Sequence, residues 1–206
     1  IAAGLRSGEM DEATLVSLAE PGMGIADEFN KVSTRVQYRN GAIFFDGDRI
    51  NNALTKHLVA KLYNGDRDWT NLIKFMEKLA ANPNESARQN LYNWVQKHGA
   101  VINPDGDLVG YKGVRPDGTS VHSGYGIVDG KVYNNDHLPH EVGSLIEYPR
   151  SWVDESSTAC SVGLHVGTYE YASGFGGPGS RLLTVTVSPT DIVGGGATHA
   201  GTFECR

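Results

Sequence analysis

Residues 101–114 read VINPDGDLVGYKGV, and the chain changes character at this stretch. Pro104, Asp105 and Gly106 supply turn chemistry between two runs of alternating residues, which is typical of a β-hairpin. From Gly99 onward the composition shifts to glycine, β-branched residues and turns. The pattern therefore predicts that residues 100–206 are mainly β-structure.

Three further stretches downstream have strand patterns. IVDGKVY predicts a second hairpin around Asp129 and Gly130, because both positions tolerate a positive φ. SLIEYP and RLLTVTV (181–187) predict further strands, and the latter alternates Leu183, Val185 and Val187 on one face. Short strands joined by tight turns indicate a mainly antiparallel sheet.

Upstream of residue 100 the apolar residues recur with a helical period. They form three successive faces: Ile50, Leu54, Leu58 and Leu62; Trp69, Leu72, Ile73, Met76 and Leu79; Ala87, Leu91, Trp94 and Val95. The intervening YNGDRD and ANPNES end one helix and cap the next. At this spacing Trp69, Met76 and Trp94 are predicted to be core residues rather than a ligand-binding aromatic cluster.

The N-terminal part predicts a tether followed by a hairpin. DEATLVSLAE (11–20) has a weak amphipathic pattern, and TRVQYRNGAIFF (34–45) places Asn40-Gly41 between two alternating runs. We therefore expect an α+β fold: an arm at 1–33, a hairpin with a three-helix unit at 34–99, and a mainly antiparallel β domain at 100–206. Because the chain starts without methionine and stops at GTFECR within a strand pattern, we expect a segment of a longer protein, truncated at the C-terminal end of this β domain.

Net charge, the length of the apolar runs and the cysteine count argue against several classes of function. The net charge of -6 is spread along the chain without a Lys/Arg block, so nucleic acid is not expected as a ligand. Apolar runs such as GAIFF fall short of the ~20 residues of a spanning helix. Cys160 and Cys205 are too few for a disulfide framework or a zinc set, which favours a reducing compartment, although one pairing between them stays open.

Two motifs have the residue types of a metal site and of a nucleophile with its base, but their spacing argues against both. DHLPH contains His137 and His140, but Pro139 between them opposes a helix and no third ligand is near, so we expect a polar surface loop and no metal. Cys160 and His165 have the residue types of a nucleophile and base. Five residues along an extended chain put them on opposite faces, so a structural cysteine is expected.

The stretch TACSVGLHVGTYEYASGF (158–175) predicts a strand that turns into a helix at the edge of a pocket, with Thr168 as the helix cap. Together with LVGYKGVR (108–115) and VHSG (121–124), it loosely resembles ADP-ribosyltransferase domains. That resemblance implies NAD as a possible cofactor. This chain has Lys112-Gly113 where such enzymes commonly have arginine or histidine, and Glu204 matches their late glutamate by position alone. The residues predicted to bind a ligand are Lys112, His122, Ser123, His165 and Tyr169.

A second resemblance covers whole segments. The blocks NLIKFMEKLAANPNESARQNLYNWV, DLVGYKGVR, VHSG, VGSLIEYPRSWVDE, CSVGLHVGTYEYASGF and VTVSPTDIV occur in the order of the rIIB rapid-lysis proteins of tailed phages. The likeness covers about 65–206 and, weakly, 34–64. It implies a protein of the infected host cell cytoplasm that works with an rIIA-like partner, peripherally at the inner membrane, and that affects lysis timing and resistance to prophage exclusion.

These patterns support competing functional hypotheses. The first is a non-enzymatic interaction module in a membrane-associated complex, with residues 49–98 as a docking face and oligomers possible. Since an acidic chain gains little from an anionic lipid surface, we expect membrane attachment through a partner. The second is a nucleotide-binding or NAD-consuming domain, and the third is a virion structural component. The first is favoured, since no catalytic residues follow from the resemblance.

Overall fold

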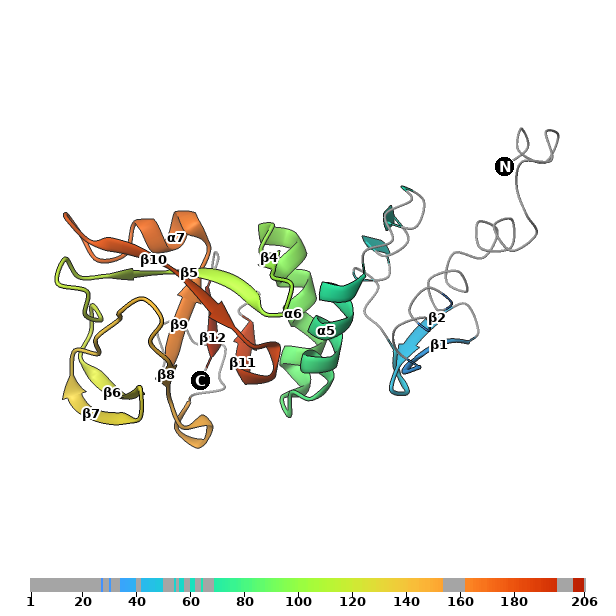
Figure 1. Ribbon diagram of the computed structural model, residues 1–206, viewed down its shortest axis with the longest axis horizontal. Helices are drawn as coiled ribbons and strands as arrows, with labels where there is room; N and C mark the ends of the chain where they lie inside the picture. The colour runs from blue at the N-terminus through green and yellow to red at the C-terminus, as the bar shows by residue number, and fades with distance from the viewer. Residues whose placement is uncertain are drawn as a thin grey trace.

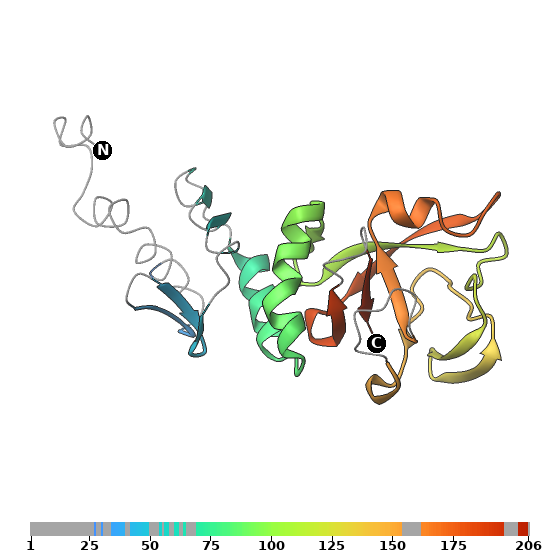
Figure 2. The same cartoon turned by 180° about the vertical axis from the view of Figure 1, so that it is seen from behind.

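The computed structural model describes residues 34–39, 42–49, 69–153, 162–195 and 202–205, together with positions 27, 30, 54, 56, 57, 60, 61 and 64. Three parts follow one another along the long axis of the molecule (Figures 1 and 2). They are a small hairpin sheet, a pair of helices and a larger β region. The helix pair lies between the other two.

The N-terminal sheet confirms the hairpin prediction. Strands β1 (Val36–Arg39) and β2 (Ala42–Phe45) pair antiparallel, with Val36 opposite Phe45 and Arg39 opposite Ala42. A short third strand, β3 (Asp48–Arg49), continues the sheet and was not predicted. The turn before it has positive φ at Asp46 (51°) and Gly47 (91°), which is the conformation of a type I′ turn.

Helices α5 (Thr70–Ala80) and α6 (Glu85–His98) match the second and third predicted helices. Asn84 caps α6, since its side-chain oxygen accepts a hydrogen bond from the Ala87 N–H at 2.8 Å. Gly99 ends α6 in the left-handed conformation at φ 62°. Most of the first predicted helix lies outside the described residues; those described there, including Leu54 and Lys56, are helical.

The main sheet is antiparallel throughout, as predicted, with strand order β10-β5-β9-β12-β11 and β4 paired to β5. Its strands are β4 (Val101–Ile102), β5 (Leu108–Val114), β9 (Leu164–Gly167), β10 (Arg181–Val187), β11 (Ile192–Gly195) and β12 (Thr202–Cys205). The hairpin around Pro104-Asp105-Gly106 is β4–β5, with Ile102 opposite Leu108. Short 3-10 turns cover Arg150–Trp152 and Pro189–Asp191.

A smaller sheet, in the order β7-β6-β8, lies at the far end of the molecule. It consists of β6 (Gly124–Val128), β7 (Lys131–Asp136) and β8 (Ile146–Glu147). The turn between β6 and β7 has positive φ at Asp129 (49°) and Gly130 (79°), as the Asp-Gly pair predicted. The SLIEYP stretch contributes only the two residues of β8.

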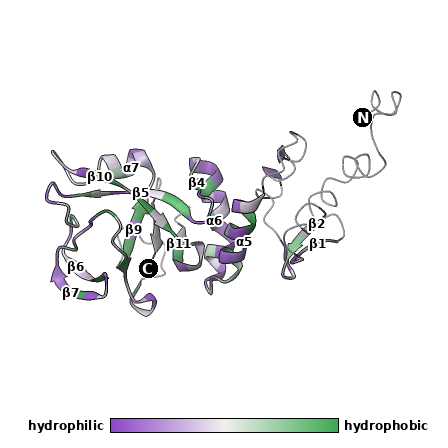
Figure 3. Ribbon diagram, in the orientation of Figure 1, coloured by the Kyte–Doolittle hydropathy of each residue, from purple (hydrophilic) through white to green (hydrophobic). Residues whose placement is uncertain are grey.

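The main core joins the helix pair to the sheet. Trp69, Met76 and Trp94 are buried in it, which confirms their predicted role. On the sheet side, the same cluster contains Leu108, Val187 and Ile192. Figure 3 shows the result: β5, β9 and β11 carry hydrophobic stretches, while α5 and α6 carry both hydrophobic and hydrophilic residues. Each of these helices buries one face, as their periodicity predicts.

Two predictions lie outside the described residues: the helix at 11–20 and the environment of Cys160. A disulfide between Cys160 and Cys205 therefore stays untested. Within the part of the chain that the structure describes, no helix is long and apolar enough to cross a membrane.

Candidate functional site

A cavity of about 460 Å³ lies where the strand-to-helix segment meets the main sheet. Volumes of this size are typical of small-molecule sites. Its walls come from β5, β9, the start of β6, the loop before β6 and the short helix α7 (Tyr169–Ser173). The polar side chains among the lining residues are Lys112, Ser120, His122, Ser123, His140 and His165, and the aromatic ones are Tyr111, Tyr125, Tyr148, Tyr171 and Phe175.

The predicted strand-to-helix turn forms one wall. β9 ends at Gly167, and Thr168 caps α7 by accepting a hydrogen bond from the Tyr171 N–H at 3.3 Å. α7 lies directly against β5 at Gly113, where a Cβ atom would stand 2.6 Å from the Ala172 carbonyl oxygen. Only glycine permits this approach, and it sets the position of α7 beside the cavity.

Lys112 and His165 lie on neighbouring strands of the cavity. The Lys112 ammonium donates a hydrogen bond to the backbone carbonyl of His165 at 3.2 Å, so its positive charge is held between β5 and β9. The register of β12 places Glu204 opposite His165.

The loop before β6 carries His122 and Ser123, which are exposed and line the same cavity. The His122 ring packs edge-on to Phe175, with the ring centroids 5.9 Å apart. Buried Ser120 fixes this loop, because its hydroxyl donates to the His122 carbonyl and accepts from the Leu138 N–H, both at 2.8 Å. The structure thus brings Lys112, His122, Ser123 and His165 around one cavity, while their binding role stays a prediction.

Tyr169, the fifth predicted residue, is not among the lining residues. The residue is 56% exposed, and its ring packs edge-on against that of Tyr111, with the ring centroids 5.5 Å apart. Tyr171, two positions later, lines the cavity instead. Since helix positions two apart point about 200° apart, only one of these tyrosines can face inward, and the sequence pattern alone does not decide which.

His140 is the residue that sequence reasoning missed. It was predicted to lie in a polar surface loop with His137, yet it is 93% buried, with 7% exposure, and lines the cavity. The reason is a pairing between distant segments: the His140 N–H donates to the Gly118 carbonyl, and the Ser120 N–H donates to the Leu138 carbonyl, both at 2.8 Å. The expectation of a surface loop was therefore wrong for His140.

The environment of His140 favours its neutral form. Burial lowers the pKa of the imidazole below its ordinary value, and the Lys112 charge lowers it further, against a smaller opposing effect of the bond to Leu138. Nδ1 lies 2.8 Å from the Leu138 carbonyl oxygen. A carbonyl only accepts, so Nδ1 carries the proton and Nε2 presents a lone pair.

The described residues contain no assembled set of metal ligands. Within the described ranges there is no group of three or more His, Cys, Asp or Glu side chains that could hold an ion. His137 and His140 each point Nδ1 at a backbone carbonyl, of Ser120 and of Leu138 respectively, at 2.8 Å.

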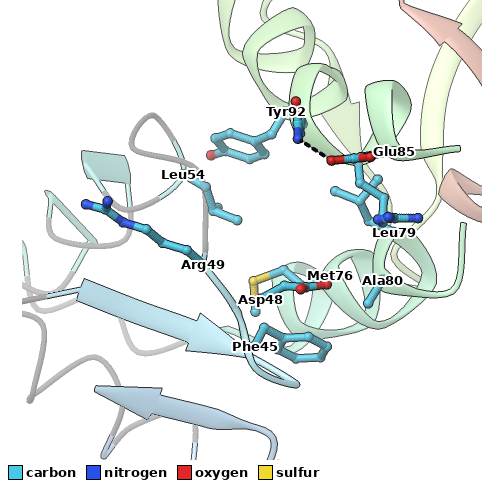
Figure 4. Close-up of a pocket in the computed structure, with 11 residues that line it drawn as sticks. Phe45, Asp48, Arg49, Leu54, Met76, Leu79, Ala80, Glu85 and Tyr92 are labelled. Atoms are coloured by element: carbon cyan, nitrogen blue, oxygen red, sulfur yellow. Dashed lines mark hydrogen bonds between the residues drawn. The ribbon is translucent and has the colours of Figure 1, made fainter. Parts of the chain in front are cut away.

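A second hollow, of about 380 Å³, lies between the hairpin sheet and the helix pair. Figure 4 shows its side chains around an open centre, with Phe45 from β2, Met76 and Leu79 from α5, and Tyr92 from α6. The charged residues in its lining are Asp48, Arg49, Glu85 and Arg88. We refer to this hollow as the hairpin–helix groove.

The hairpin–helix groove is held by contacts between the two parts. Arg35 pairs with Asp46 beside the turn, and its guanidinium also lies 3.3 Å from the Glu77 carboxylate on α5. The Arg35 guanidinium lowers the pKa of Asp46 and also stands over the Phe45 ring at 4.5 Å. Burial raises the pKa of Tyr92, in the groove wall, to about 12.

Comparison with known proteins places the chain in a family. A family profile described as Bacteriophage T4 protein rIIB matches residues 5–201. The chain is 27% identical to Protein rIIB of Enterobacteria phage T4 over 163 residues, which are 79% of this chain and 48% of that protein. The chain thus spans about half the length of this relative. No solved structure matches it. The profile covers nearly the whole sequence, so the chain belongs to the rIIB family of bacteriophage proteins.

Proposed function

We propose that this chain is a partner-binding module that acts without catalysis in the phage-infected bacterial cell. The observation that carries this proposal is the hairpin–helix groove, which combines apolar side chains with a charged rim. Phe45, Met76 and Leu79 line its floor and are at most 8% exposed, while Asp48 and Arg49 lie exposed at its edge. Because this floor belongs to the main core, the exposed charged rim is the part that a partner can contact, and complementary charges give an interface its specificity.

The partner we propose is an rIIA-like phage protein, in a complex that affects lysis timing and resistance to prophage exclusion. Membership of the rIIB family supports this setting. We further propose that the complex sits peripherally at the inner face of the host membrane and is attached through the partner. The net charge of -6 supports attachment by protein contacts over direct binding to an anionic lipid surface.

Affinity capture from infected cells tests this proposal. The chain carries an affinity tag and is compared with Arg49→Glu, a charge reversal on the exposed groove rim, and with Arg181→Glu, at an exposed site on β10 outside the groove. We expect the unmodified chain and Arg181→Glu to retain the rIIA-like protein, and Arg49→Glu to lose most of it. Recovery of the unmodified chain alone, or equal loss in both variants, would contradict the proposal.

Membrane attachment has its own test. Fractionation of cells that express the chain with and without the rIIA-like protein should place it in the membrane fraction only when the partner is present. Membrane association of the chain alone would show that the lipid contact is direct.

A further inference from the structure

The cavity beside α7 arises where two strands of the main sheet separate. β5 and β9 are paired only at Tyr111 and Gly167. Beyond this pair β5 continues to Val114 along β10, while β9 runs along β12. Lys112 and Gly113 on one strand and Leu164 and His165 on the other therefore line the cavity instead of completing a ladder.

His140 lines the cavity and carries a buried polar atom that has no partner in the described structure. His140 is 93% buried, with 7% exposure, and its Nε2 makes no hydrogen bond there. Its other nitrogen, Nδ1, is committed to the Leu138 carbonyl. A buried acceptor without a donor carries a desolvation cost, because its hydrogen bond to water is not replaced. Less than 1 Å² of Nε2 is accessible, so a ligand N–H reaches it when the side chains that cover this atom shift. Such a bond removes the cost, so the site favours ligands with a hydrogen-bond donor.

A positive charge lies near this acceptor. The Lys112 ammonium lines the same cavity and is close enough to His140 to lower the pKa of the imidazole. A positive potential favours the oxygen of a carbonyl group. A donor for His140 beside an oxygen for Lys112 is the arrangement found along one edge of an amide.

The remaining walls suit a flat ligand. The Tyr171 and Phe175 rings are stacked at 6.1 Å with 21° between their planes, and His122 packs edge-on to Phe175. All of these residues line the cavity. Aromatic walls favour planar ring systems, and a cavity of about 460 Å³ accommodates a ring with further substituents.

We propose that this cavity binds a planar heteroaromatic ligand with an amide edge, whose N–H donates to His140 Nε2 and whose carbonyl oxygen faces Lys112. Two ligand sources share this chemistry: a ring with a carboxamide substituent, as in nicotinamide, and a lactam nucleobase, as in uridine. The site is distinct from the hairpin–helix groove, so this inference does not depend on the partner-binding function proposed above.

Calorimetric titration of the full chain with matched ligand pairs tests the inference. Nicotinamide is compared with methyl nicotinate, and uridine with 3-methyluridine; the second compound of each pair keeps the ring and the carbonyl but lacks the N–H. We expect one amide to bind at least about tenfold more tightly than its matched compound, the effect of one hydrogen bond to a buried acceptor. The pair that discriminates identifies the ligand source. Equal binding within both pairs, or no binding of either amide at millimolar concentration, overturns the proposal.

Variants locate the contact. His140→Phe keeps a buried ring without an acceptor and should abolish the discrimination within the pair. Lys131→Met, on the exposed face of β7 outside the cavity, is the control and should keep it. Retained discrimination in a folded His140→Phe variant overturns the assignment.

The ¹⁵N resonance of His140 Nε2 in the unmodified chain gives a readout that does not depend on the folding of any variant. It should move when the amide binds, because the lone pair gains a donor. If nicotinamide or uridine binds and this resonance stays in place, the proposed contact is wrong.

Discussion

The Arg150 guanidinium donates a hydrogen bond to the Asn82 side-chain oxygen at 3.0 Å, across 68 positions of sequence. Asn82 is buried in the loop between α5 and α6. Its amide nitrogen donates to the carbonyls of Pro189 and Ile192, both at 2.6 Å, and Arg150 also donates to the Thr190 carbonyl at 3.1 Å. One asparagine thus joins the helix pair to the turn between β10 and β11.

We expect Asn82→Ala to lower the free energy of unfolding by roughly 2–4 kcal/mol, because it leaves buried carbonyls and part of the Arg150 guanidinium without their partner. Urea denaturation measures this change. Asn90→Ala is the matched control, since Asn90 lies exposed on α6 and bonds only to Ser86 within its own helix. The control should change stability by less than about 0.5 kcal/mol. Similar losses of unfolding free energy in both variants would show that the hydrogen bonds of Asn82 stabilise the fold no more than the exposed bond of Asn90.

The sequence predicted the elements that local chemistry determines. The Asp129-Gly130 turn between β6 and β7 follows from residues that accept positive φ, and α5 and α6 follow from apolar residues at helical spacing. Thr168 is a cap whose partner lies three residues away. In each case the interacting groups are close in sequence, so the pattern contains the information.

The parts that escaped prediction depend on distant contacts. His140 is buried because residues 118–120 pair with residues 138–140, and no local pattern marks that pairing. The strand order β10-β5-β9-β12-β11 joins segments far apart in sequence. The choice of Tyr171 over Tyr169 as a lining residue depends on how α7 lies on Gly113. The cavity was therefore predicted in outline, while its buried acceptor was not.

Gly113→Ala should displace α7 and destabilise the fold by about 1–3 kcal/mol, the usual cost of overpacking. The new methyl would clash with the Phe175 carbonyl oxygen and would stand 2.6 Å from that of Ala172. Thermal unfolding measures the effect. Gly124→Ala is the control because a Cβ there meets no atom within 4 Å. An unchanged melting temperature for Gly113→Ala would mean that α7 moves away without cost.

Tyr92→Phe should reduce the loss of unfolding free energy that the chain shows at alkaline pH. Burial raises the pKa of Tyr92 from 10.0 to about 12 in the folded state. Between these values the unfolded phenol loses its proton while the folded one keeps it, so the folded state loses stability as the pH rises. The loss should reach roughly 2–3 kcal/mol. Urea unfolding of both proteins between about pH 9 and pH 12 measures the difference between the two curves. Parallel curves would contradict a buried, neutral Tyr92.

His140→Gln should remove part of the acid sensitivity of the fold. Burial and the Lys112 charge lower the pKa of His140 in the folded state, so the unfolded imidazole takes up a proton first as the pH falls below 6.5. Stability from this residue is therefore complete above pH 6.5 and decreases below it, until the folded pKa is reached. The variant has no imidazole at this position, and the difference in its unfolding free energy between about pH 7.5 and about pH 5.5 should be smaller than in the unmodified chain. An NMR titration of the His140 ring in the unmodified chain is the independent measurement. A midpoint at or above 6.5 would mean that water reaches the ring, and Nε2 would then have a partner before any ligand arrives.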